Sequence, residues 1–182
     1  MGFQISDASG KSYGAKVDSS NRIYTLSTIQ TLDRSYNEGG YVHSVYFEVT
    51  PAGANDYFFY LKNNGLKNLF ITDIRISSTV ATELYYNKVS GTPSYTSATD
   101  ITTTNRNLGS SKTITSTIKY DTDITGLTNE GTIFFQQCPV ADTLYHLRTS
   151  SNIIIPQGSA VAFQRVAATG QIDCLISIVE GE

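Results

Sequence analysis

The chain has 182 residues, of which 40% are hydrophobic and only 16% are charged, and its formal net charge is −3. This length predicts one domain that can bury roughly 70% of its unfolded surface, so folding requires neither disulfides nor a metal. The acidic balance excludes the basic face that a nucleic-acid partner needs, and no stretch approaches the roughly 18 apolar residues of a membrane span.

The first twenty residues are rich in Gly and Ser, and they lack the basic start and apolar centre of a signal peptide. Their apolar residues are too widely spaced for a core strand, so this segment buries little surface to offset its conformational entropy. We expect residues 1–20 to form an arm that adds a strand to the open sheet edge of a neighbouring subunit or shell. The alternative is that it pairs with the domain's own sheet. The possible docking residues are Phe3, Ile5, Tyr13 and Val17.

Residues 21–182 are predicted to form a single β-sandwich domain. Apolar and polar residues alternate with the two-residue period of half-buried strands, and residues 57–62 are aromatic on both faces, which predicts a buried central strand. Two polar stretches, 90–108 and 121–130, are predicted to be an exposed excursion and a loop. The predicted strands cover residues 22–31, 41–50, 57–62, 69–77, 80–89, 112–120, 131–137, 143–148, 159–167 and 171–179.

These segments amount to about nine or ten strands separated by turn signals, and no stretch has the periodicity of an amphipathic helix. Thr and Tyr, which favour strands, replace the Glu, Lys and Ala that exposed helix faces prefer. The fold class is therefore all-β, and the pattern favours an antiparallel β-sandwich that resembles a jelly roll.

The search for catalytic residues finds two histidines, His43 and His146, each expected to be hydrogen-bonded within a strand. Neither has the partner spacing of a metal site or a catalytic pair, and the sequence contains no Gly-x-Ser-x-Gly or phosphate-binding glycine motif. We therefore expect no enzymatic activity and no cofactor.

The remaining candidate ligands are Asp121 and Asp123, which are spaced like the start of a calcium loop. Gly126 occupies the required sixth position, but the twelfth is Thr132 rather than Glu, so a solvated turn without a metal is favoured. Cys174 lies in an alternating apolar strand and is expected to be a buried free thiol. A disulfide between Cys138 and Cys174 is not expected, because no export signal is visible.

Aromatic residues are abundant, with 12 Tyr, 8 Phe and no Trp. So much aromatic area beside so little charge indicates a protein interface or a surface that stacks on sugar rings. We expect a homo-oligomer, with a trimer as the leading possibility.

Several motifs resemble small virion proteins of tailed bacteriophages. In those proteins a glycine-containing start leads into an element like the one at residues 15–23, and the similarity touches most of the chain. The motifs are Asp7-Ala8-Ser9-Gly10, Ala15-Lys16-Val17-Asp18, Asn21-Arg22-Ile23, Phe59-Tyr60-Leu61-Lys62-Asn63-Asn64, Leu69-Phe70-Ile71-Thr72-Asp73-Ile74, Asn105-Arg106-Asn107-Leu108-Gly109-Ser110-Ser111-Lys112 and Ile155-Pro156-Gln157-Gly158-Ser159-Ala160-Val161.

The resemblance implies a β-sandwich structural protein of the virion, of the capsid decoration or cement type, which has no active site. Its partners would be the major capsid protein or other virion proteins, and it would bind the outside of the shell. Two alternatives stay open: a neck, tail or fibre component of the particle, or a carbohydrate-binding or adhesion module.

Overall fold

The computed structural model describes residues 36–166 and 169–181, except for the side chains of residues 148–152, together with the backbone of four short strands before residue 25. The chain divides into two compact units, residues 1–32 and residues 33–182, and each is described by itself. In the first unit, two antiparallel pairs form, β1 (Gln4–Ser6) with β2 (Ser12–Gly14) and β3 (Lys16–Val17) with β4 (Ile23–Tyr24).

The second unit is a β-sandwich, and the only helical segment among its described residues is one turn at residues 36–38. Most strands are seven residues long or longer, and β9 and β10 are two-residue pairings. The strands are β5 (Val42–Val49), β6 (Tyr57–Asn63), β7 (Leu69–Ser78), β8 (Thr82–Tyr95), β9 (Thr99–Asp100), β10 (Thr104–Asn105), β11 (Ser116–Cys138), β12 (Tyr145–Ile155), β13 (Ala160–Arg165) and β14 (Ile172–Glu180).

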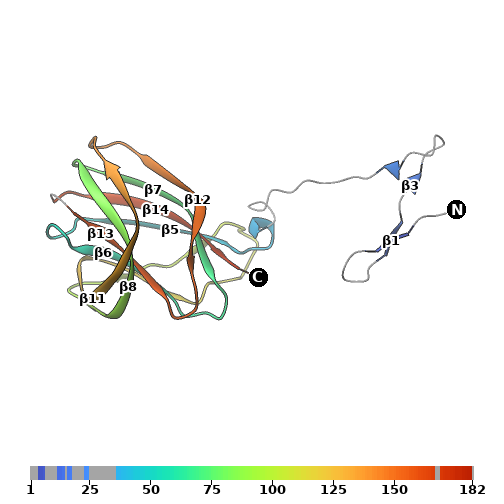
Figure 1. Cartoon of the computed structure of the whole chain (residues 1–182), viewed down its shortest axis with the longest axis horizontal. Coiled ribbons are helices and arrows are strands. Elements are labelled where there is room, and N and C mark those ends of the chain that lie inside the picture. The colour runs from blue at the N-terminus through green and yellow to red at the C-terminus, as the bar shows by residue number, and fades with distance from the viewer. Residues whose placement is uncertain are drawn as a thin grey trace. The chain divides into compact units, whose positions relative to one another are not determined.

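The strand order is that of a jelly roll. One layer, the β5 sheet, has the order β10-β5-β14-β7-β12, and the other, the β6 sheet, has the order β6-β13-β8-β11-β9 (Figure 1). Without the two short strands, successive strands alternate between the sheets, apart from β8 and β11, which pair within the β6 sheet. Two four-stranded antiparallel sheets wound in this way make the eight-stranded double Greek key. The predicted antiparallel β-sandwich of the jelly-roll kind is confirmed.

The core lies between the two sheets, and the sequence alternation explains which side chains enter it. In β5, Val45, Phe47 and Val49 are buried, whereas Tyr46 and Glu48 between them are exposed. In β6, four consecutive residues from Phe58 to Leu61 are buried. This confirms the prediction of a strand that is covered on both faces.

Strand β11 corrects two expectations. Residues 121–130 are part of this strand rather than a loop, and residues 90–95 of the expected excursion extend β8 as its partner. Most residues of 90–95 and 121–130 are exposed, and Thr and Gly are common among them. The apolar alternation that marks a half-buried strand is therefore missing. Backbone pairing with β8 supplies the strand geometry there.

The β6 sheet curls until it closes on its outer face. β11 pairs with β6 over residues 116–124 and with β8 over residues 124–138, while β13 pairs with both β6 and β8. We call this closed set of four strands the β6–β13–β8–β11 ring. A second apolar cluster fills it, formed by Tyr60, Val89, Ile124, Ala160 and Ala162.

Two glycines allow the β8–β11 pair to bend so sharply. Gly91 and Gly126 have φ angles of 98° and 74° and lie beside each other in the two strands. A Cβ atom on Gly91 would lie 2.5 Å from the carbonyl oxygen of Gly126, and one on Gly126 would lie 2.5 Å from that of Thr92. Only glycine fits where two backbones approach this closely at positive φ.

Candidate functional site

A pocket of about 280 Å³ opens at one end of the β6–β13–β8–β11 ring. Its walls come from the end of β6, the start of β13, the middle of β8 and the adjoining part of β11. We call it the ring pocket. Its polar lining residues are Tyr60, Lys62, Lys88, Ser90, Glu130 and Ser159.

A β-bulge places Glu130 at the ring pocket. Asn129 pairs with Val89 and Gly131 pairs with Lys88, so Glu130 is the extra residue with no partner across the ladder. The Asn129 side chain accepts a hydrogen bond from the Gly131 N–H at 2.8 Å, and Gly131 has a φ of 148° that suits the bulge. A bulge of this kind redirects a side chain out of the regular alternation.

The Glu130 carboxylate pairs with the Lys88 ammonium group at 2.7 Å. Hydrogen bonds from Lys88 and from the Ser90 hydroxyl lower the pKa of Glu130, so it is ionised at neutral pH. The bulge and this pair fix a carboxylate on one wall of the pocket.

Two further groups of the ring pocket have no polar partner among the residues that the structure describes. The Lys62 side chain makes no ion pair or hydrogen bond with the described residues, and the Tyr60 hydroxyl likewise bonds to none of them. Tyr60 is only 3% exposed, and burial raises its pKa, so its hydroxyl keeps its proton at neutral pH. A buried tyrosine usually bonds through its hydroxyl, and here the Tyr60 side chain lines the pocket.

Of the carboxylates at Asp121 and Asp123, that of Asp121 stabilises the fold. Asp121 is buried in β11 and accepts hydrogen bonds from the backbone N–H groups of Thr96, Ser97 and Thr122. Its oxygens are therefore occupied, and no cluster of three or more metal-binding side chains occurs in the described part of the chain. The expected solvated turn was wrong, because these residues lie in a strand.

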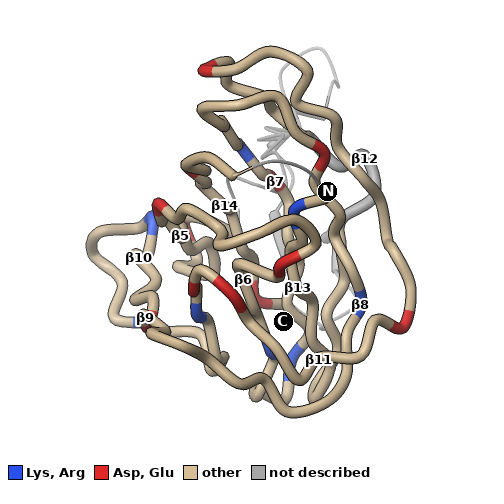
Figure 2. The backbone as a smooth tube through the Cα atoms, turned by 90° about the vertical axis from the view of Figure 1, so that its left-hand side faces the viewer, with Lys and Arg blue, Asp and Glu red and all other residues tan. Residues whose placement is uncertain are grey.

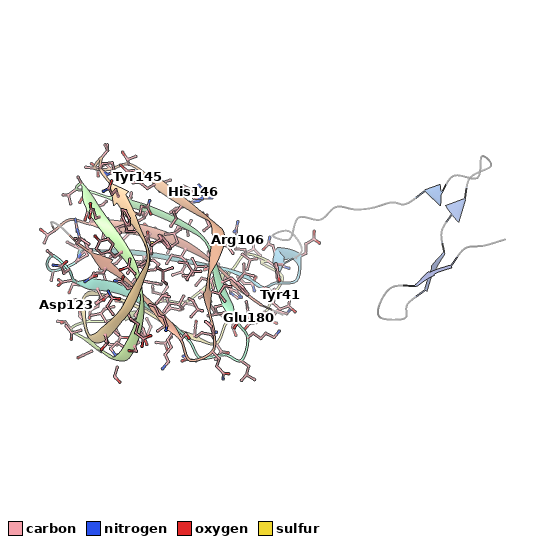
Figure 3. All side chains as sticks on the ribbon, in the orientation of Figure 1. Tyr41, Arg106, Asp123, Tyr145, His146 and Glu180 are labelled. Carbon is pink, nitrogen blue, oxygen red and sulfur yellow. The ribbon has the colours of Figure 1, made fainter. Side chains whose placement is uncertain are left out.

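The two histidines lie on the β5 sheet. His146 contacts the carboxylate of Asp73 on the neighbouring strand, as expected for a hydrogen-bonded strand histidine. His43 is buried, and its Nδ1 has no hydrogen-bond partner among the described residues; burial lowers its pKa, against the opposing charge of Glu180. Figure 3 shows Asp123 and His146 far apart on the sandwich, so these candidate groups do not converge on one site.

Both cysteines are free, as expected, and both are buried, which had been expected only for Cys174. Burial raises the pKa of the Cys138 thiol to about 11 and raises that of Cys174 further. Since the thiolate is the reactive form, neither residue is suited to nucleophilic or redox chemistry.

An apolar surface follows the open edge of β11. Over residues 131–138 this strand pairs with β8 on one side, and no strand among the described residues pairs with its other side. Ile133 and Phe135 on the strand, and Val140 and Leu144 in the loop that follows it, are 44–64% exposed. We call this open backbone with its four side chains the β11 edge surface.

Charged residues are dispersed over the sandwich rather than gathered on one element (Figure 2). No helix in the described part of the chain is long and apolar enough to cross a membrane. The side chains of the expected docking residues Phe3, Ile5, Tyr13 and Val17 lie outside the described part, so the arm and its boundary at residue 20 stay predictions.

Comparisons of the chain with known protein families, with curated proteins and with solved structures found no match.

Proposed function

We propose that this chain is a structural protein of a bacteriophage particle, a decoration or cement protein that binds the outside of the capsid shell. The sequence resemblance to small virion proteins supports this role, and so does the fold, because jelly rolls build viral capsids as well as lectins and cupins. The observation that carries the proposal is the β11 edge surface.

Among the described residues, this edge has no charged side chain, proline or covering strand of the kind that keeps single-chain β-proteins from pairing with each other. Natural edge strands are usually blunted by charged residues, by proline or by a covering segment. Residues 131–138 read Gly-Thr-Ile-Phe-Phe-Gln-Gln-Cys, without charge or proline. The bulge at Ile133 interrupts the ladder once, and residues 134–138 after it pair regularly with β8. An uncharged edge with exposed aromatic area supports the proposal that a partner covers it.

The partner that we assign to the edge is a second copy of the chain. Every copy offers the same open edge, and the low charge lets identical surfaces approach without strong repulsion. The open backbone supplies hydrogen bonds, and Phe135, whose ring packs edge-on against Tyr85, supplies a preorganised aromatic contact. The expected oligomer is a trimer, in which each edge contacts a different surface of the next copy, because pairing of two identical edges would close a dimer. We propose that this trimer binds the major capsid protein.

Light scattering of the purified protein tests this assembly. The wild type is expected at a multiple of 19.9 kDa at micromolar concentration, with three copies expected. Phe135→Lys places a charge on the edge and should shift the mass to that of one chain. Tyr46→Lys is the matched control, because Tyr46 is 57% exposed on the β5 sheet and Phe135 is 59% exposed.

The Tyr46→Lys variant should keep the wild-type mass. A wild-type mass of 19.9 kDa, or a Phe135→Lys mass equal to that of the wild type, would count against assembly through the edge.

A second candidate function, a carbohydrate-binding or adhesion module, is favoured by one observation, the ring pocket. Such a module also fits a neck, tail or fibre component of a particle. The pocket's chemistry decides which sugars would bind.

A further inference from the structure

From the ring pocket we infer a binding site for a single acidic sugar residue, such as a terminal uronic acid of a glycan. The sugar carboxylate pairs with the Lys62 ammonium group, and its hydroxyls bond to the Glu130 carboxylate and the Tyr60 hydroxyl. The inference is independent of the β11 edge surface, since none of the pocket residues belongs to it.

The size of the pocket limits the ligand to about one ring. Pockets for drug-sized ligands are roughly 300–1,000 Å³ in volume, and the ring pocket lies just below that range at about 280 Å³. It also lies on rigid backbone, between paired strands of a closed ring, so little ordering is needed on binding.

The charge of the lining favours an anion that also carries hydroxyl groups. Lys62 and Lys88 face one carboxylate, that of Glu130, so the lining is positive overall. Lys88 already neutralises Glu130, which leaves Lys62 as the cation without a partner among the described residues. A ligand carboxylate completes an ion pair with Lys62, and partial burial strengthens that pair relative to one in open water.

Glu130 distinguishes an acidic sugar from a simple anion. Its carboxylate oxygens accept hydrogen bonds and repel a phosphate that carries up to two negative charges. Sugar hydroxyls donate hydrogen bonds to such an acceptor, and the protonated Tyr60 hydroxyl can both donate and accept. The pocket thus offers the Lys62 ammonium group to a ligand carboxylate and the oxygens of Glu130 and Tyr60 to ligand hydroxyls. An acidic sugar carries both kinds of group.

Isothermal titration calorimetry on the full-length chain tests this site with glucuronate, glucose and inorganic phosphate as probes. Glucuronate is expected to bind with a dissociation constant on the order of 1 mM, which is the scale of a few polar contacts. Glucose and phosphate should each bind at least about tenfold more weakly than glucuronate. Glucose lacks the carboxylate that pairs with Lys62, and phosphate is repelled by the Glu130 carboxylate.

Lys62→Gln keeps most of the side-chain stem and removes the charge. It should weaken glucuronate binding about tenfold while leaving glucose binding and the melting temperature unchanged. Lys67→Gln is the matched control, since Lys67 is exposed and lies outside the lining of the pocket, and its glucuronate affinity should equal that of the wild type.

Equal affinity for glucuronate and glucose, binding of phosphate as tight as that of glucuronate, or an unchanged Lys62→Gln variant would each overturn the inference. Absence of heat with 20 mM glucuronate (about twentyfold above the expected constant) would do the same. Neither Lys62→Gln nor the sugar is expected to change the oligomer mass. The inference of sugar binding and the proposal of assembly through the β11 edge surface are therefore tested independently.

Discussion

Replacing Phe163 with alanine is expected to lower the free energy of unfolding by about 3–5 kcal/mol, the range for a buried Phe→Ala change. Phe163 is fully buried in β13, the strand between β6 and β8. Its ring centroid lies 4.5 Å from that of Tyr86, 4.6 Å from that of Phe59 and 6.3 Å from that of Phe58. The truncation removes the ring on which these three others converge, and paired strands on both sides prevent the cavity from collapsing.

Urea denaturation followed by fluorescence or circular dichroism measures this change, and thermal unfolding should show a melting temperature lower by roughly 6–20 °C. Leu66→Ala is the control, because Leu66 is 86% exposed and its truncation should change stability by about 0.5 kcal/mol or less. A loss below about 1 kcal/mol for Phe163→Ala would mean that the aromatic packing between the sheets is not as described.

The second large effect is expected for Asp121→Ala, at about 2–4 kcal/mol. The Asp121 carboxylate accepts backbone N–H groups of Thr96 and Ser97 at 2.7 and 2.9 Å, and that of Thr122 at 2.7 Å. These bonds hold the segment after β8 against the middle of β11, where a loop had been expected. Alanine leaves three partly buried donors without their charged acceptor, and each such loss costs roughly 1–3 kcal/mol before water replaces part of it.

The Asp121 contribution should depend on pH in a defined direction. Burial alone would raise the pKa of Asp121, but hydrogen bonds from the backbone of Ser97, Thr122 and Thr96 outweigh it and lower the pKa. A lowered folded-state pKa means that the stabilisation is complete above the unfolded value near 4 and is lost as the pH falls below it. The stability difference between the wild type and Asp121→Ala should therefore be largest at pH 7 and smaller at pH 2.

Urea denaturation of both proteins at pH 7, 4 and 2 measures that difference. The pKa of Asp123 shifts in the opposite direction, because burial and the charges of Asp56 and Asp121 raise it. Because Asp121 is the smallest of these causes, the difference between the wild type and Asp121→Ala reports chiefly the Asp121 carboxylate, with an opposing contribution from Asp123. A difference that is constant from pH 7 to pH 2 would contradict the role given to its charge.

The sequence indicates the strands of the sandwich where burial is one-sided or complete. In β5 and β14, apolar residues recur at every second position because one face of each strand packs against the core. These strands can therefore be predicted from the sequence alone. The aromatic run in β6 likewise predicts burial on both faces. In β11 the prediction fails, because residues 121–130 pair by their backbone while exposing most of their side chains.

The ring pocket could not be predicted from any local pattern. Lys62, Lys88 and Glu130 come from three strands that are far apart in the chain, and they meet because the β6 sheet closes on itself. Glu130 reaches the pocket through one extra residue in the ladder, which has no sequence signature beyond the Asn129 and Gly131 beside it. The β11 edge surface could be predicted in part, since Ile133 and Phe135 were expected to lie in a strand. Their exposure could not be predicted, because it depends on whether another strand pairs with the open side of β11.

The proposed virion role is tested most directly by electron cryomicroscopy of native particles of a phage whose genome is found to encode the chain. The proposal predicts jelly-roll density on the outside of the capsid shell, in groups of copies whose β11 edges each face a neighbouring copy. Particles that lack this chain, or copies in which residues 131–138 face solvent, would contradict it.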